Sequence, residues 1–167
     1  RNGDMAADDT VEILIGHKAW ANKRLFDKLT SIPDIESMKD IQVIIGTLNH
    51  AYVVDCIFKA HLESKSHSFK GVNASPLPSL TELYEFVAEI DHWYIDYADE
   101  LSNDDLAQRL EFQFTSGEDA SMLRKEVLLH VANHGTYHRG NVAVWMQQNS
   151  IYPDQDVLTD FIISRSN

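Results

Sequence analysis

The segment from about residue 121 to residue 148 carries an evenly spaced row of side chains that could bind a metal ion. Each member of the row follows the previous one by four residues: Glu126, His130, His134 and His138. In an α-helix, residues at this spacing lie on one face, one turn above the other. Two imidazoles at that separation can reach a common ion, as they do in helices with an H-E-x-x-H metal pattern. The spacing therefore predicts a metal-binding helix face.

The apolar residues of this segment indicate which histidines point inward. At about 100° per residue they form one stripe about 80° wide: Val127, Val131, Gly135, Val142 and Trp145. His134 and His138 fall within or beside this stripe, so we expect both to point into the core. His130 falls on the flank, where an ordinary surface histidine is the better interpretation than an extension of the site. Buried imidazoles need partners for their nitrogen atoms, and a metal ion satisfies that need.

A third ligand is expected from a neighbouring helix, because two ligands hold a divalent ion weakly. An apolar helix is predicted from about Met38 to Glu63, and His50 lies near the middle of its stripe. His61 lies about 16 Å further along this helix, so both cannot serve one ion. Three neutral histidines plus water are typical of an open catalytic site, whereas closed structural sites use four protein ligands. Zinc, nickel and iron all accept such ligands.

The length and composition indicate one globular domain. The chain has 167 residues, of which 44% are hydrophobic, and this is enough for an ordinary core. We expect residues 1–9 to be a disordered segment, with residues 1–4 an expression remnant ahead of Met5, and residues 10–167 to form the domain. The single cysteine, Cys56, excludes an internal disulfide and favours a reducing cytoplasm. By helical angle Cys56 also points away from His50, so it is not expected to be a ligand.

The charge of the chain bears on its partners. The formal net charge is −12, which disfavours both nucleic acid and anionic membranes. No segment of the sequence approaches the roughly 20 uninterrupted apolar residues that a membrane span needs. The expected partner is therefore a small-molecule substrate.

Helical periodicity dominates the rest of the chain. Four long helices are predicted: about Thr10 to Leu29, Met38 to Glu63, Ser79 to Leu101 and Ser121 to Gln148. The third should open with a capping box formed by Ser79 and Glu82. A short fifth helix should follow Pro153, and the alternation from Leu110 to Phe114 is a weak strand signal. The predicted fold class is all-α, a four-helix bundle with a short C-terminal helix and a small extended crossover.

The stretch from His130 to Asn141, HVANHGTYHRGN, resembles the hallmark of the DinB-like superfamily of metal-dependent four-helix-bundle proteins. Trp20-Ala21-Asn22 resembles part of that family's first helix, and Leu48-Asn49-His50 resembles part of its second. The resemblance implies a metal triad at His50, His134 and His138. At Asn141 the family often has glutamine, so the amide is kept on a shorter side chain.

The resemblance also implies a function. The superfamily includes transferases that use low-molecular-weight thiols such as bacillithiol or mycothiol as cosubstrates. One hypothesis is therefore a metal-dependent thiol transferase, with metal-activated hydrolysis as a close variant, and with zinc or nickel favoured over iron. The other is a non-catalytic metal or small-ligand binding module, induced by stress. A homodimer is also expected.

Three further side chains have alternative interpretations. Arg139 could bind an anionic substrate or pair with one of the many acidic residues. Glu126 is interpreted as a solvated charge or as an acid favoured near a helix start. His17 could line the pocket, but a histidine at the edge of the core is the better interpretation.

Overall fold

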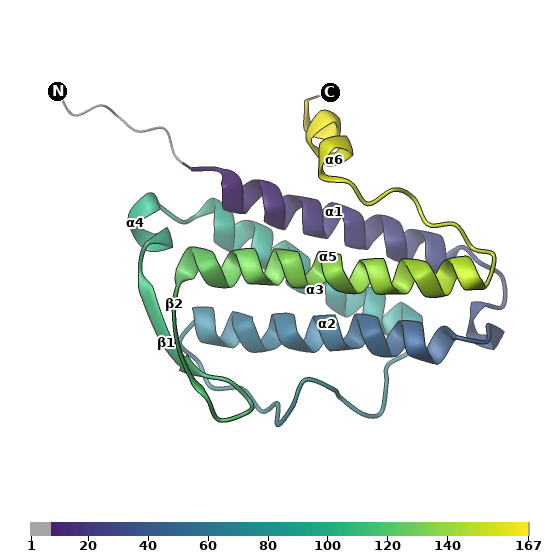
Figure 1. Cartoon of the computed structure of the whole chain (residues 1–167), viewed down its shortest axis with the longest axis horizontal. Coiled ribbons are helices and arrows are strands. Elements are labelled where there is room, and N and C mark those ends of the chain that lie inside the picture. The colour runs from purple at the N-terminus through teal and green to yellow at the C-terminus, as the bar shows by residue number, and fades with distance from the viewer. Residues whose placement is uncertain (1–7, 167) are drawn as a thin grey trace.

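The computed structural model describes residues 8–166 as a bundle of four long helices whose axes run side by side (Figure 1). These helices are α1 (Thr10–Thr30), α2 (Ile41–Leu62), α3 (Leu80–Asp99) and α5 (Arg124–Gln148). Around the bundle, α1 contacts α3 and α5, and α2 contacts the same two helices from the opposite side. The predicted all-α bundle is thus confirmed. Most of the N-terminal segment predicted to be disordered, residues 1–7, lies outside the described residues.

The ends of α3 show how local sequence fixes an element. The Ser79 hydroxyl accepts a hydrogen bond from the backbone N–H of Glu82, and the Glu82 carboxylate accepts one from the backbone N–H of Ser79 at 2.9 Å. This reciprocal pair satisfies two of the donors that a helix start leaves without partners. The predicted capping box is therefore present, and α3 begins where it places the helix.

The core fills the space between the four helices. Its fully buried members come from all of them: Ile15, Phe26, Leu29, Ile44, Ile45, Val53, Leu83, Tyr94, Val127, Leu128, Val131 and Met146. Among the described residues, α2 is the one helix with the length and mean hydropathy of a membrane-crossing helix, although 56% of its apolar stretch is buried inside the bundle. The expectation that no uninterrupted apolar run would reach this length holds for α2, because Asn49, Asp55 and Lys59 interrupt it. A core helix packed on several sides is apolar around much of its circumference.

A β-hairpin precedes α5. Strand β1 (Arg109–Gln113) pairs antiparallel with β2 (Asp119–Leu123), so that Leu110 lies opposite Met122. The predicted extended crossover is this hairpin. The fourth helix was predicted to begin at Ser121, but that boundary was wrong, since residues 121–123 belong to β2 and α5 begins at Arg124. Cross-strand pairing supplies the backbone partners that a helix would otherwise provide.

Three short elements complete the chain. The 3₁₀-helix η1 (Ile35–Ser37) and the one-turn helix α4 (Asn103–Leu106) were not predicted from the sequence. The predicted fifth helix is α6 (Leu158–Arg165), which follows a segment that runs back along α1 (Figure 1). Phe161 of α6 is buried, and its ring lies 5.8 Å from that of Trp20 on α1. The C-terminal helix is thus anchored to the first helix of the bundle.

Candidate metal centre

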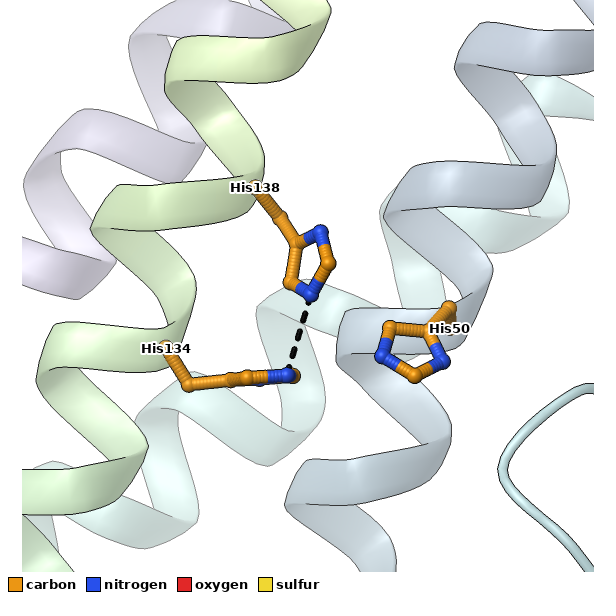
Figure 2. A group of neighbouring side chains, drawn as sticks. All are labelled: His50, His134 and His138. Atoms are coloured by element: carbon orange, nitrogen blue, oxygen red, sulfur yellow. Dashed lines mark hydrogen bonds between the residues drawn. The ribbon is translucent and has the colours of Figure 1, made fainter.

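Three histidines meet between two neighbouring helices. Figure 2 shows His134 and His138, one turn apart on α5, projecting toward His50 on α2. Each offers one ligand nitrogen, and these three atoms lie within 4.8 Å of one another. The Nε2 atoms of His134 and His138 are 3.0 Å apart. Two nitrogens that both bind one ion at about 2.1 Å must lie within about 4.2 Å of each other, so this pair fits a shared ion.

The second nitrogen of His50 has a partner that fixes its ring. Its Nδ1 lies 3.0 Å from the backbone carbonyl oxygen of Val72, in the loop between α2 and α3. A carbonyl oxygen can only accept, so Nδ1 carries the proton and Nε2 keeps its lone pair. A histidine that binds a metal usually donates its other N–H in this way. The loop therefore presents the correct nitrogen of His50 to the site.

The surroundings of His134 and His138 favour the neutral forms of these two imidazoles. Burial lowers the pKa of His134 to about 4, with smaller contributions from the neighbouring His138 and His130. Burial also lowers the pKa of His138, and His50 adds to that effect. A neutral imidazole is the form that binds a transition metal. All three side chains are half-buried, so the site is shielded but not sealed.

The other candidates, His130 and Glu126 of the histidine row and His61 on α2, lie outside the triad. His130 is exposed, and its ring lies 5.5 Å from that of His134. Glu126 caps α5, because its carboxylate accepts a hydrogen bond from the backbone N–H of Leu123 at 2.7 Å. His61 lies beside His67 and Phe112, whose ring centroids are 5.4 Å and 4.5 Å from its own. The spacing alone therefore selected more residues than the site uses.

Arg139 and His17, each with two alternative interpretations, both contact one acid in the C-terminal segment. Arg139 is buried, and its Nε lies 2.5 Å from a carboxylate oxygen of Asp156. His17 is also buried, and its Nε2 lies 3.0 Å from the other oxygen of Asp156. Arg139 thus pairs with an acid, and His17 is a core-edge histidine that contacts Phe161 and Trp20.

A buried ion cluster behind the triad was missed in the sequence. The Lys18 ammonium lies 2.7 Å from a carboxylate oxygen of Asp55 and 2.5 Å from one of Asp91, and all three side chains are buried. Burial alone would lower the pKa of Lys18, but the two carboxylates offset this and raise it. Asn22 donates to Asp91 at 2.7 Å and completes the cluster. The cluster ties α1 to α2 and α3.

The missed cluster did leave a signal in the sequence. Lys18 and Asn22 stand three and seven residues after Ile15, so they share its buried helix face. Asp55 likewise interrupts the apolar run from Val53 to Phe58. Charged residues on a buried face are rarely tolerated without partners. A lysine on the buried face of one helix and an acid on the buried face of another therefore indicate an ion pair between the two helices.

A solvent-open cavity of about 480 Å³ lies beside the triad. Two of the three histidines, His50 and His138, form part of its wall. The rest of the wall comes from α2, α5 and the loop that orients His50: Val43, Gly46, Thr47, Asn49, Asn73, Ala74, Leu77 and Asn141. This volume accommodates a small molecule next to the triad. The position of the loop residues in this wall could not be read from local patterns.

Comparisons with known proteins identify the family and agree with the fold. The sequence matches the DinB family over residues 7–156. It is 27% identical over 144 residues to Protein DinB of Bacillus subtilis strain 168, covering 81% of this chain and 83% of that protein. The crystal structure of a DinB-like protein from Bacillus cereus has the same fold, with a TM-score of 0.56 and 16% identity over 83% of this chain and 90% of that one. A match over this much of the sequence shows that the chain belongs to the DinB family.

Proposed function

We propose that the protein binds one divalent metal ion, zinc or nickel, through His50, His134 and His138, and that the ion activates a small-molecule nucleophile. The observation that carries the proposal is the convergence of three ligand nitrogens beside an open cavity. Three histidine ligands leave room on the ion for water or substrate, as in catalytic sites. An ion held in this way would lower the pKa of a bound thiol or water and so would supply a nucleophile near neutral pH.

The chain's own residues position the reactants rather than attack them. Val72 fixes the ring of His50, and the cavity wall offers a surface against which a substrate can lie. Cys56, the single cysteine, does not line this cavity, and burial raises the pKa of its thiol. A thiol with a raised pKa is a poor nucleophile at neutral pH. The nucleophile is therefore expected to come from solution.

The favoured reaction is transfer of a low-molecular-weight thiol, such as bacillithiol or mycothiol, to an electrophilic substrate. The sulfur of the thiol forms a bond to the electrophilic carbon, the leaving group departs with its electron pair, and the thiol proton passes to solvent. Hydrolysis, in which water replaces the thiol, is the close variant. The open cavity supports both over a sealed binding module, because a reaction requires access to the ion.

The proposal extends to the location, the oligomeric state and the domain organisation of the protein. We propose a cytoplasmic location, supported by the single cysteine, and a homodimer that pairs through a helix face. We also propose that residues 10–167 act as one domain. Analytical ultracentrifugation of the purified chain tests the oligomeric state.

An activity screen tests the catalytic part. Zinc-loaded and nickel-loaded proteins are incubated with a low-molecular-weight thiol and a panel of electrophiles, and separately with esters and amides. We expect turnover that disappears in a His138→Ala variant and persists in a His92→Ala variant, because His92 lies on α3 with a side chain 76% exposed. If the metal-loaded protein conjugates no thiol and hydrolyses no substrate, the chain is a non-catalytic binding module.

A further inference from the structure

The cavity beside the triad has an unusual wall for a protein with a net charge of −12. Apart from the two histidines, its polar side chains are three amides and a hydroxyl: Asn49, Asn73, Asn141 and Thr47. The remaining residues are apolar or small. Among the described residues that form this wall, none is an aspartate, glutamate, lysine or arginine. The acidic residues that give the chain its negative charge thus lie outside this wall.

The neutral side chains come from three separate parts of the fold. Thr47 and Asn49 lie on α2 in the turn before His50, and Asn73 follows the carbonyl that orients His50. Asn141 lies on α5 three residues after His138, so it shares the face of the metal ligand. The amide groups therefore line the cavity next to the triad and come from both helices and from the loop.

We infer that the part of the substrate bound in this cavity is uncharged and bears amide or hydroxyl groups, an inference that rests on the proposed function. Each amide side chain both donates and accepts hydrogen bonds, so the wall matches groups that do the same. A carboxylate placed here would lose water without meeting a cation from the wall. A bound thiolate would offset one of the two positive charges of a divalent ion. The remainder of the molecule meets the amides.

On α5, Asn141 is the residue that we expect to favour uncharged ligands. It is the one residue of α5, besides His138, that lines the cavity. A longer cationic side chain at this position would extend into the wall and supply the partner that an anion lacks. The preference for neutral ligands should then reverse, while the three histidines remain unchanged.

Two pairs of probes of nearly equal shape test the inference on cobalt-loaded protein, whose visible spectrum reports ligand binding to the ion. The first pair is nicotinamide and nicotinate, which share the ring nitrogen as a metal ligand and carry a neutral amide or an anionic carboxylate at the same distant position. The second pair is 3-mercaptopropionamide and 3-mercaptopropionate, which bind through sulfur. We expect each neutral probe to bind at least about tenfold more tightly than its anion in the wild-type protein.

Variants separate the wall from the overall charge. Asn141→Lys should reduce or reverse the preference, whereas Gln148→Lys should leave the ratio of affinities within about twofold of wild type. Gln148 is exposed, lies on the same helix and does not line the cavity, so its replacement changes the net charge by the same amount.

The outcomes distinguish this inference from the proposed function. If nicotinamide is preferred and neither thiol binds, the neutral cavity stands and the thiol reaction is wrong. If the thiols bind but the anions bind as tightly as the neutral probes, the thiol reaction stands and the inference is wrong. It is also wrong if neither member of the nicotinamide pair binds, or if Asn141→Lys and Gln148→Lys shift the ratio equally.

Discussion

The Nδ1 atom of His50 and the backbone carbonyl oxygen of Val72 lie 3.0 Å apart, so the loop after α2 determines which imidazole nitrogen faces α5. This contact joins two residues 22 positions apart in the chain. It gives His50, one of the three proposed ligands, one defined tautomer. The same loop then continues as part of the cavity wall, through Asn73, Ala74 and Leu77. The orientation of the His50 ring and the shape of the cavity thus depend on one segment.

The tautomer of His50 can be observed directly. In the zinc-loaded protein labelled with nitrogen-15, we expect the Nδ1 of His50 to carry a proton that exchanges slowly with solvent, because Val72 accepts it. Its Nε2 should show the chemical shift of a metal-bound nitrogen. A His50 ring protonated at Nε2 would show that the contact with Val72 does not set the ligand.

The lowered pKa of His134 predicts how the metal-free protein responds to acid. The pKa of His134 falls from 6.5 in the unfolded chain to about 4 in the folded one. Between these pH values the unfolded chain binds a proton that the folded protein does not, so the free energy of unfolding should fall as pH drops from 6.5 toward 4. Above pH 6.5 this contribution is fully present.

Urea titrations of chelator-treated protein at several pH values measure this effect. A His134→Asn variant, which lacks the titrating group, should lose less stability over the same range than wild type does. Other groups titrate in both proteins and cancel in the comparison. Equal loss in the two proteins would contradict the assignment to His134.

The Lys18 cluster should be essential for stability. Lys18→Met leaves Asp55 and Asp91 buried without their cation, which should reduce the free energy of unfolding by about 3–5 kcal/mol. The matched control is Lys23→Met, because Lys23 also pairs with an aspartate but has a side chain 70% exposed. This control should change stability little. Similar urea midpoints for both variants would contradict the role of the cluster.

A close approach between α1 and α5 depends on Gly135. A Cβ atom at this position would lie 3.1 Å from the Nη1 of Arg139 and 3.3 Å from the Cε of Lys18. Gly135→Ala should therefore destabilise the protein by about 1–3 kcal/mol, despite the better helix propensity of alanine.

Gly140 offers a matched comparison on the same helix. A Cβ atom there would meet nothing within 4 Å. Gly140→Ala should therefore stabilise the protein, by up to about 1 kcal/mol. Thermal unfolding of both variants measures the difference. A stabilising Gly135→Ala change would show that α1 and α5 do not approach closely at Lys18.

The parts of the structure that were predicted from sequence are those that helical periodicity determines. The inward direction of His134 and His138 followed from their spacing relative to Val127 and Val131, and the structure brings both next to His50. The capping box at Ser79 also predicted the start of α3, because it too is a local sequence pattern. Such features need only a few neighbouring residues.

The parts that were not predicted depend on contacts between distant segments. Ser121 was assigned to a helix because its partner Glu111 lies across the hairpin, in a segment with only a weak strand signal. Val72 could not be connected to His50, because nothing local fixes where a loop passes. Asp156, the partner of Arg139, lies in a segment whose position the helical pattern does not predict.

The most direct test of the account is elemental analysis of the purified protein alongside His50→Ala, His138→Ala and His92→Ala variants. We expect about one zinc or nickel ion per chain in the wild-type protein and in His92→Ala, and clearly less metal per chain in the other two variants, because each lacks one of the three ligands. Full metal occupancy in either His50→Ala or His138→Ala, or no bound metal in the wild-type protein, would contradict the proposed three-histidine site.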